Sequence, residues 1–323
     1  MNYTFNENPV QNEKYKQISE IKSLSIEAGI CVIGFCIMYE LLGIFTVIPS
    51  LHELLTKSQL FYQCFSMVST MLAICIPFFL MGNRFSKKTD IDIIPLGRPN
   101  DFRLAFLAVP SGVMLCLVGS IITSYFTVFL DSVGIRLTSP DMSSPSGGYE
   151  LIIYLLRLTI TAAVMEEVVI RGVIMQPLRK YGNWFAILMS AMIFAFLHCN
   201  LVQAPFAFLA GIAIGYFTIV TGTVWTGIFI HLINNSISAI TAYYIAIGQA
   251  DRGNLVGTLL IDIMIVLGIV CLVAFGKMRG SFSIDKKPLL LSKGERAKAY
   301  LITIPMVIAF ALICYYTSYF IDL

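Results

Sequence analysis

Charged residues are scarce in this chain: they make up 13% of its 323 residues, whereas hydrophobic residues make up 57%. A soluble domain is about one quarter charged, so the composition argues against a soluble enzyme. None of the 8 cysteines has Cys-x-x-Cys spacing, and disulfides are not indicated. The first 27 residues are polar and mixed in charge, unlike a cleavable signal peptide. We therefore expect the first apolar span to serve as its own insertion signal.

The chain contains several long runs of apolar residues. A helix needs about 20 apolar residues to cross a bilayer, and lipid excludes open backbone structures, so such runs predict helices. The fold class is therefore expected to be an all-α, polytopic membrane helix bundle with about nine transmembrane helices (eight to nine). The runs cover about residues 28–50, 60–82, 104–130, 149–177, 183–199, 203–220, 223–247, 256–276 and 299–320.

Basic residues between the runs predict an orientation. They gather in segment 83–103, at Arg179 and Lys180, and in segment 277–298 with seven Lys or Arg residues, while the intervening loops are poor in them. Because basic loops stay in the cytoplasm, we expect a cell-membrane protein with a cytoplasmic N-terminus and an external C-terminus. The net charge of +3 is then a topology signal, and no nucleic-acid partner is expected.

The runs and loops divide the chain into four parts. No internal repeat is evident, which argues against a secondary transporter. The parts are a cytoplasmic tail (1–27), three accessory helices with an external loop (28–148), a core bearing the polar motifs (149–247), and two C-terminal helices joined by the basic cytoplasmic linker 277–298 (248–323).

Two adjacent glutamates and an arginine lie inside the run 149–177. A charge at membrane depth costs several kcal/mol unless it is paired or hydrated, so such a cluster indicates a functional site. Glu167 and Arg171 are four residues apart and can pair on one helix face. Glu166 lies about 100° around the helix and is free to titrate. A buried carboxyl beside another carboxylate suits a general base near neutral pH.

Histidines are rare, and two of the three lie within or beside apolar runs. Phe194 shares a helix face with His198, and His231 shares one with Asn235, because each pair is four residues apart. From a turn near Gly182, position 166 and position 198 are each sixteen residues away on antiparallel helices, so they should lie at equal depth. His231 fits this count less well.

Three further charges, Glu40, Arg157 and Asp262, lie inside apolar runs. Arg157 and Asp262 both fall toward the external halves of their predicted helices. We therefore expect an interhelical ion pair between them.

The motifs resemble those of the CAAX-protease and bacteriocin-processing family, also called the Abi family. The resemblance covers about residues 150–240 and implies a four-helix catalytic core within 149–247. Its three motifs are Glu-Glu-x-x-x-Arg, Phe-x-x-x-His and His-x-x-x-Asn, which stand here in the family's order as Glu166-Glu167 with Arg171, Phe194 with His198, and His231 with Asn235.

What the resemblance implies is an intramembrane endopeptidase acting on a membrane-associated peptide or protein. Glu166 would activate water and His198 would assist or orient it. His231 and Asn235 would donate to the developing oxyanion. Glu167 and Arg171 would hold the site in shape, with Phe194 as packing.

Several alternatives stay open. The chemistry needs no cofactor, yet Glu166, His198 and His231 could bind zinc with water as the fourth ligand. The chain has no His-Glu-x-x-His motif, and this ligand set would consume the glutamate needed as base. A non-catalytic membrane scaffold or a bacteriocin self-immunity protein of the same fold is the alternative to an enzyme, and a transporter is a third reading.

Overall fold

The computed structural model describes residues 9–89, 94–138, 148–284 and 289–322, without the side chains of 83–89. Three basic side chains of segment 83–103, at positions 84, 87 and 88, and residues 139–147 of the expected external loop lie outside this description. Within the described residues the chain is a helix bundle with one antiparallel pair of short strands, β1 (Arg136–Leu137) and β2 (Ile321–Asp322). The all-α fold class is confirmed.

The helices follow one another with short connections. In chain order they are α1 (Pro9–Phe45), α2 (Pro49–Lys57), α3 (Gln59–Thr89), α4 (Phe102–Ser132), α5 (Gly148–Leu156), η1 (Arg157–Thr161), α6 (Ala162–Glu167), η2 (Val168–Ile174), α7 (Met175–Leu178), η3 (Arg179–Tyr181), α8 (Asn183–Phe196), α9 (Ala204–Thr221), α10 (Val224–Ala246), α11 (Ala250–Arg279), α12 (Lys293–Leu301) and α13 (Ile304–Ser318).

The bundle is polytopic, but a count of nine spans is not confirmed. Among the described residues, six helices are long and apolar enough to cross a membrane, namely α1, α3, α4, α9, α10 and α11. A seventh span is obtained if α12 and α13, which bend by 72°, are taken as one. Two expected spans differ in form. Helix α8 has only 14 residues, and the stretch from α5 to α7 contains the π-helical segments η1 and η2.

The bend between α12 and α13 is tied to α1. Helix α12 begins with a reciprocal capping box between Ser292 and Glu295, which satisfies two of its free amides. At the break, Ser25 of α1 donates to the carbonyl oxygen of Tyr300, and its hydroxyl lies 2.6 Å from that of Thr303. The buried Ser25 therefore satisfies polar groups where the helix stops.

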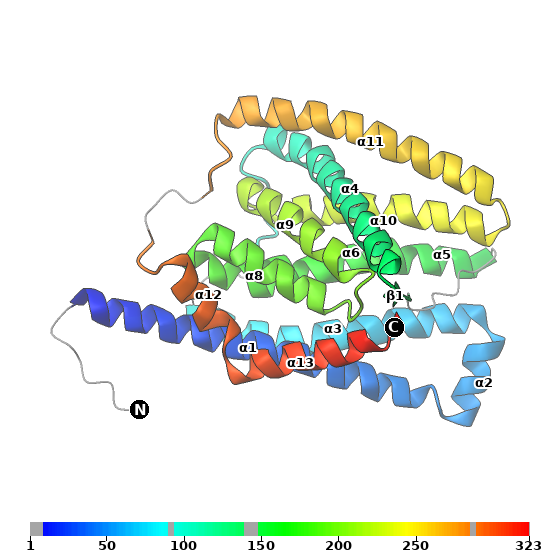
Figure 1. The fold of residues 1–323 in the computed structure, drawn as a ribbon, viewed down its shortest axis with the longest axis horizontal. Helices are drawn as coiled ribbons and strands as arrows, with labels where there is room; N and C mark the ends of the chain where they lie inside the picture. The colour runs from blue at the N-terminus through cyan, green and yellow to red at the C-terminus, as the bar shows by residue number, and fades with distance from the viewer. Residues whose placement is uncertain (1–8, 90–93, 139–147, 285–288, 323) are drawn as a thin grey trace.

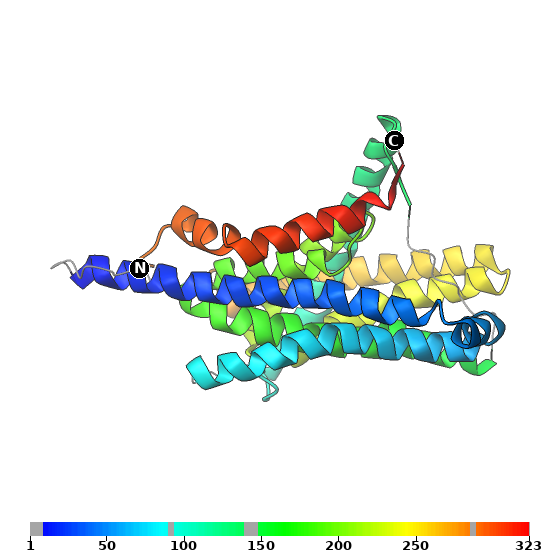
Figure 2. The same cartoon turned by 90° about the horizontal axis from the view of Figure 1, so that it is seen from below.

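The helices form three layers (Figure 1). Helices α8, α9 and α10 and the stretch α5–α7 lie in the middle, with α4 and α11 on one side and α1, α3 and α13 on the other. Figure 2 shows α1 between α3 and α13, running along both. The predicted core is thus flanked by helices from both outer parts of the chain.

The basic segments after α7, at the end of α11 and in α12 gather at one end of the bundle (Figure 1). There Lys180 Nζ lies 2.7 Å from Glu20 Oε2, and Arg296 Nη1 donates to the carbonyl oxygen of Tyr181 at 2.5 Å. Helix α2 lies at the opposite end. The arrangement agrees with the alternation of loop charge, and the compartment that each end faces stays a prediction.

Candidate active site

Glu167 and Arg171 form the expected ion pair at the junction of α6 and η2. Arg171 Nε lies 3.1 Å from Glu167 Oε2, and both side chains are 0% exposed. Arg171 Nη2 also donates to the Gly211 carbonyl at 3.4 Å, and its guanidinium lies 4.9 Å from the ring centroid of Phe194. The pair therefore links the α6–η2 stretch to α8 and α9 in the centre of the bundle.

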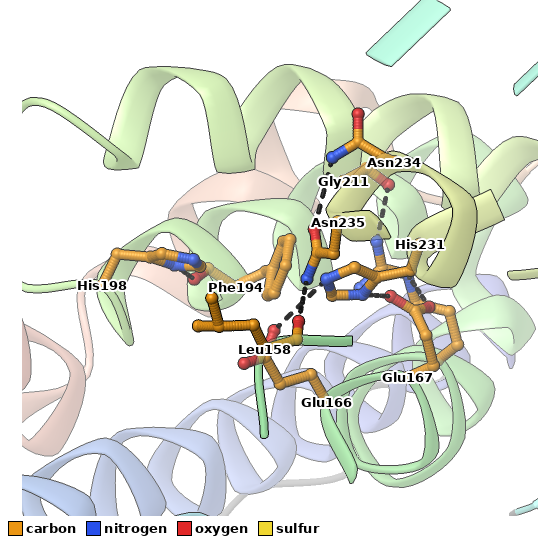
Figure 3. Close-up of polar contacts among 10 residues, drawn as sticks. Leu158, Glu166, Glu167, Phe194, His198, Gly211, His231, Asn234 and Asn235 are labelled. Atoms are coloured by element: carbon orange, nitrogen blue, oxygen red, sulfur yellow. Dashed lines mark hydrogen bonds and ion pairs between the residues drawn. The ribbon is translucent and has the colours of Figure 1, made fainter. Parts of the chain in front are cut away.

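His231 of α10 completes this buried network, which the sequence did not predict. Its Nδ1 lies 2.9 Å from Glu167 Oε1. A carboxylate paired with arginine only accepts, so Nδ1 carries the proton and donates. The other ring nitrogen, Nε2, faces Glu166 Oε2 at 3.8 Å, which is too long for a hydrogen bond. His231 therefore stands between the two adjacent glutamates (Figure 3).

At two glycines, Gly211 and Gly227, the helices pack too closely for a larger side chain. A Cβ at Gly227, one turn before His231, would lie 3.0 Å from Glu167 Oε2 and 2.8 Å from the hydroxyl of Thr218. A Cβ at Gly211 would lie 2.9 Å from the Cβ of Ala191 on α8. Helices α8 and α9 therefore approach closely at Gly211, whose carbonyl oxygen also accepts from Arg171.

His198 lies just beyond the end of α8 with one ring nitrogen fixed. Its Nδ1 lies 2.9 Å from the carbonyl oxygen of Phe194, four residues earlier. Because a carbonyl only accepts, Nδ1 donates and Nε2 is left with a lone pair or a second proton. Figure 3 shows His198 and His231 on opposite sides of Phe194. The Phe194 ring centroid lies 5.0 Å from that of His198 and 5.8 Å from that of His231.

Asn235 is held by two hydrogen bonds. Its Nδ2 donates to the carbonyl oxygen of Leu158 at 2.9 Å, and its Oδ1 accepts from Nδ2 of Asn234 at 3.3 Å. One N–H of the Asn235 amide remains beyond the bond to Leu158. Asn234 is buried and orients the residue next to it.

One cavity joins the candidate residues. It has a volume of about 470 Å³, and its walls include Glu166, His198, His231 and Asn235. The Glu166 side chain is 17% exposed, in contrast to its sealed neighbour at position 167. Helices outside the predicted core also contribute to the wall, for example through Phe35 of α1. The core alone therefore does not enclose the cavity.

Arg157 also lines this cavity, and its expected ion pair is not formed. Asp262 is exposed on α11, whereas Arg157 Nη1 donates to the hydroxyl of Ser66 on α3 at 2.6 Å. The expectation matched the two residues by depth alone and took no account of the direction in which each side chain leaves its helix. The predicted pair is wrong.

The alternative zinc site is not assembled in the described residues. Across residues 9–82, 94–138, 148–284 and 289–322, no group of three or more His, Cys, Asp or Glu side chains is arranged to hold a metal ion. Glu166, His198 and His231 line the same cavity without meeting at one point. They do not fit a metal in this arrangement.

The segment that carries these residues is similar to a known protein family. Residues 148–237 match the family model described as Type II CAAX prenyl endopeptidase Rce1-like. This Rce1-like segment contains all seven motif residues described above. Comparisons with curated proteins and with solved structures found no match. The matched segment, less than a third of the chain, is similar to that endopeptidase family. The long apolar helices are those of a multi-pass membrane protein.

Proposed function

We propose that the protein is an intramembrane endopeptidase that hydrolyses a peptide bond in a membrane-associated peptide or protein. The observation that carries this proposal is the shared cavity. Glu166 is accessible from it together with His198, His231 and Asn235, while Glu167 is sealed behind the wall. Two adjacent carboxylates thus have different surroundings, a pattern typical of paired residues with separate catalytic roles.

In the proposed mechanism Glu166 is the general base. It removes a proton from a water molecule as the water oxygen attacks the scissile carbonyl carbon. The lone pair on Nε2 of His198 accepts a hydrogen bond that orients the same water. When the tetrahedral intermediate collapses, the proton held by Glu166 passes to the leaving amine, and the C–N bond breaks. Glu166 is then ready for another cycle.

His231 and Asn235 stabilise the oxyanion of that intermediate. Nδ1 of His231 already donates to Glu167, so His231 can donate to the substrate only through a protonated Nε2. The remaining N–H of Asn235 supplies a second donor beside it. Removing one such donor typically lowers kcat by about 10²–10³.

The buried pair of Glu167 and Arg171 positions this machinery without touching the substrate. Glu167 holds the His231 ring through Nδ1, and Arg171 holds Glu167 and packs against Phe194. Since every member is buried, the network fixes His231 relative to Glu166. A scaffold or immunity protein would have no need of an accessible Glu166 in one cavity with two histidines, which is why hydrolysis is favoured.

The test is peptidase activity of the purified full chain in lipid vesicles on a peptide library, with products identified by mass spectrometry. Glu166→Gln keeps the size of the side chain but removes the base. Glu53→Gln, an exposed position on α2, is the matched control. We expect cleavage by the wild type and the control and at least about a thousandfold loss in Glu166→Gln. Equal activity in all three proteins would remove the proposal.

A further inference from the structure

Arg157 is a cation in the wall of the catalytic cavity, and no carboxylate in the part of the chain that the structure describes neutralises it. Among the described residues it has no ion pair, and its only polar partner is the hydroxyl of Ser66. Its guanidinium lies 5.7 Å from the ring centroid of Tyr154. A cation–π contact of this kind is only weakly attractive and does not neutralise the charge. Nε and Nη2 are buried and have no hydrogen-bond partner among the described atoms.

Leaving such a group unpaired is costly. A buried polar atom without a partner costs about as much as a lost hydrogen bond, and more when the group is charged. The walls of the cavity contain one carboxylate, that of Glu166, which the proposed mechanism already uses. The described residues therefore leave the charge of Arg157 available to an anion that enters the cavity.

The local helix geometry turns Arg157 toward the cavity. Glu166 lies nine positions after Arg157, and in a regular α-helix that spacing places two side chains about 180° apart. Arg157 begins the π-helical segment η1, which ends at Thr161. A π-helical turn holds about one extra residue, which shifts the side chains back by about 100°. Both residues consequently line the same cavity. Such π segments often occur at functional sites.

We infer that Arg157 binds a carboxylate of the substrate and thereby sets where the peptide is cleaved. This inference rests on the proposed endopeptidase function and makes Arg157 a specificity-determining residue. A guanidinium presents parallel N–H groups that match the two oxygens of a carboxylate. Nε and Nη2, the two nitrogens without partners, belong to one edge of that group.

The distance to the base predicts the position of that carboxylate along the peptide. A rise of about 1.5 Å per residue places Arg157 and Glu166 about 13 Å apart along the helix. An extended peptide advances about 3.3 Å per residue. The carboxylate is therefore expected about three to four residues from the scissile bond. It can be the C-terminus of the substrate or an Asp or Glu side chain at that distance.

The experiment compares peptides that differ only in this charge. Each library peptide cleaved by the wild type is made as the free acid, as the C-terminal amide, and as the amide with Glu three or four residues beyond the scissile bond. The measured quantity is the ratio of kcat/KM for acid to amide within one protein, so a general loss of activity cancels. The proteins are wild type, Arg157→Gln, Arg157→Lys and the control Arg252→Gln, which changes an exposed arginine of α11.

The wild type and Arg252→Gln are expected to prefer the free acid, or the Glu-bearing amide, by at least about tenfold, because a charge-assisted pair is among the stronger hydrogen bonds. This preference should fall toward one in Arg157→Gln and survive in part in Arg157→Lys. A wild-type ratio near one for both carboxylate sources would overturn the inference even if no variant folds, as would an unchanged ratio in Arg157→Gln. Absence of cleavage of any peptide would instead remove the endopeptidase proposal, and the inference with it.

Discussion

Replacing Arg171 by methionine tests whether the buried ion pair organises the bundle. The substitution keeps a long side chain but leaves the Glu167 carboxylate, which is 0% exposed, without its cation. Removing one partner of a buried pair typically costs about 3–5 kcal/mol, because the remaining charge stays buried and uncompensated. Arg171 also donates to the Gly211 carbonyl and packs on Phe194. We expect Arg171→Met to lower the free energy of unfolding by about 3–5 kcal/mol.

The double variant separates the lost charge balance from the lost packing. In Glu167→Gln/Arg171→Met both charges are gone, and the glutamine oxygen can still accept from Nδ1 of His231. Residues in one polar network typically show coupling of about 0.5–3 kcal/mol. The double variant should therefore be more stable than the sum of the two single variants indicates, by about 1–3 kcal/mol.

The assay is reversible unfolding in one detergent, monitored by circular dichroism. The four proteins are the wild type, Glu167→Gln, Arg171→Met and the double variant. If the single losses add to the double loss within about 0.5 kcal/mol, or if Arg171→Met costs less than about 1 kcal/mol, the pair is not coupled as its geometry indicates. Phe194→Leu, which removes the aromatic face below the guanidinium, serves as a packing control.

Three more results follow from the site. Gly227→Ala should place a methyl group against Glu167 and cost about 1–3 kcal/mol by overpacking. Gly43→Ala, inside α1 with nothing within 4 Å, should instead stabilise the protein by about 0.5–1 kcal/mol in the same unfolding assay. Asn235→Ala should lower kcat by about 10²–10³ through loss of an oxyanion donor; an effect on KM alone would contradict that role. Peptidase activity should persist after dialysis against a chelator, and loss restored by added zinc would favour the metal alternative.

The parts of the site that depend on local spacing were predictable from the sequence. Glu167 and Arg171 pair because residues four apart share a helix face, and this geometry does not depend on the neighbouring helices. The placement of Glu166 and His198 in one cavity also agrees with their equal distance from the turn at Gly182.

The contacts between distant helices were not predictable in the same way. The bond from His231 to Glu167 depends on the register of α10 against α6, which no local pattern encodes. The predicted pairing of Arg157 with Asp262 failed because depth does not fix the direction of a side chain, and the π-helical turn at η1 changes that direction. The count of nine spans is not confirmed because hydropathy registers apolar length, not the bend after α12 or the shortness of α8.

The central claim is that the Glu166 carboxylate activates water inside the cavity. The most direct measurement is peptide cleavage by the purified protein in water enriched in oxygen-18. The account predicts that each new C-terminal carboxyl carries one oxygen-18 atom when the wild type is used, and that Glu166→Gln forms no labelled product above background. Labelled product at the same rate from both proteins, or wild-type product without the label, would contradict it.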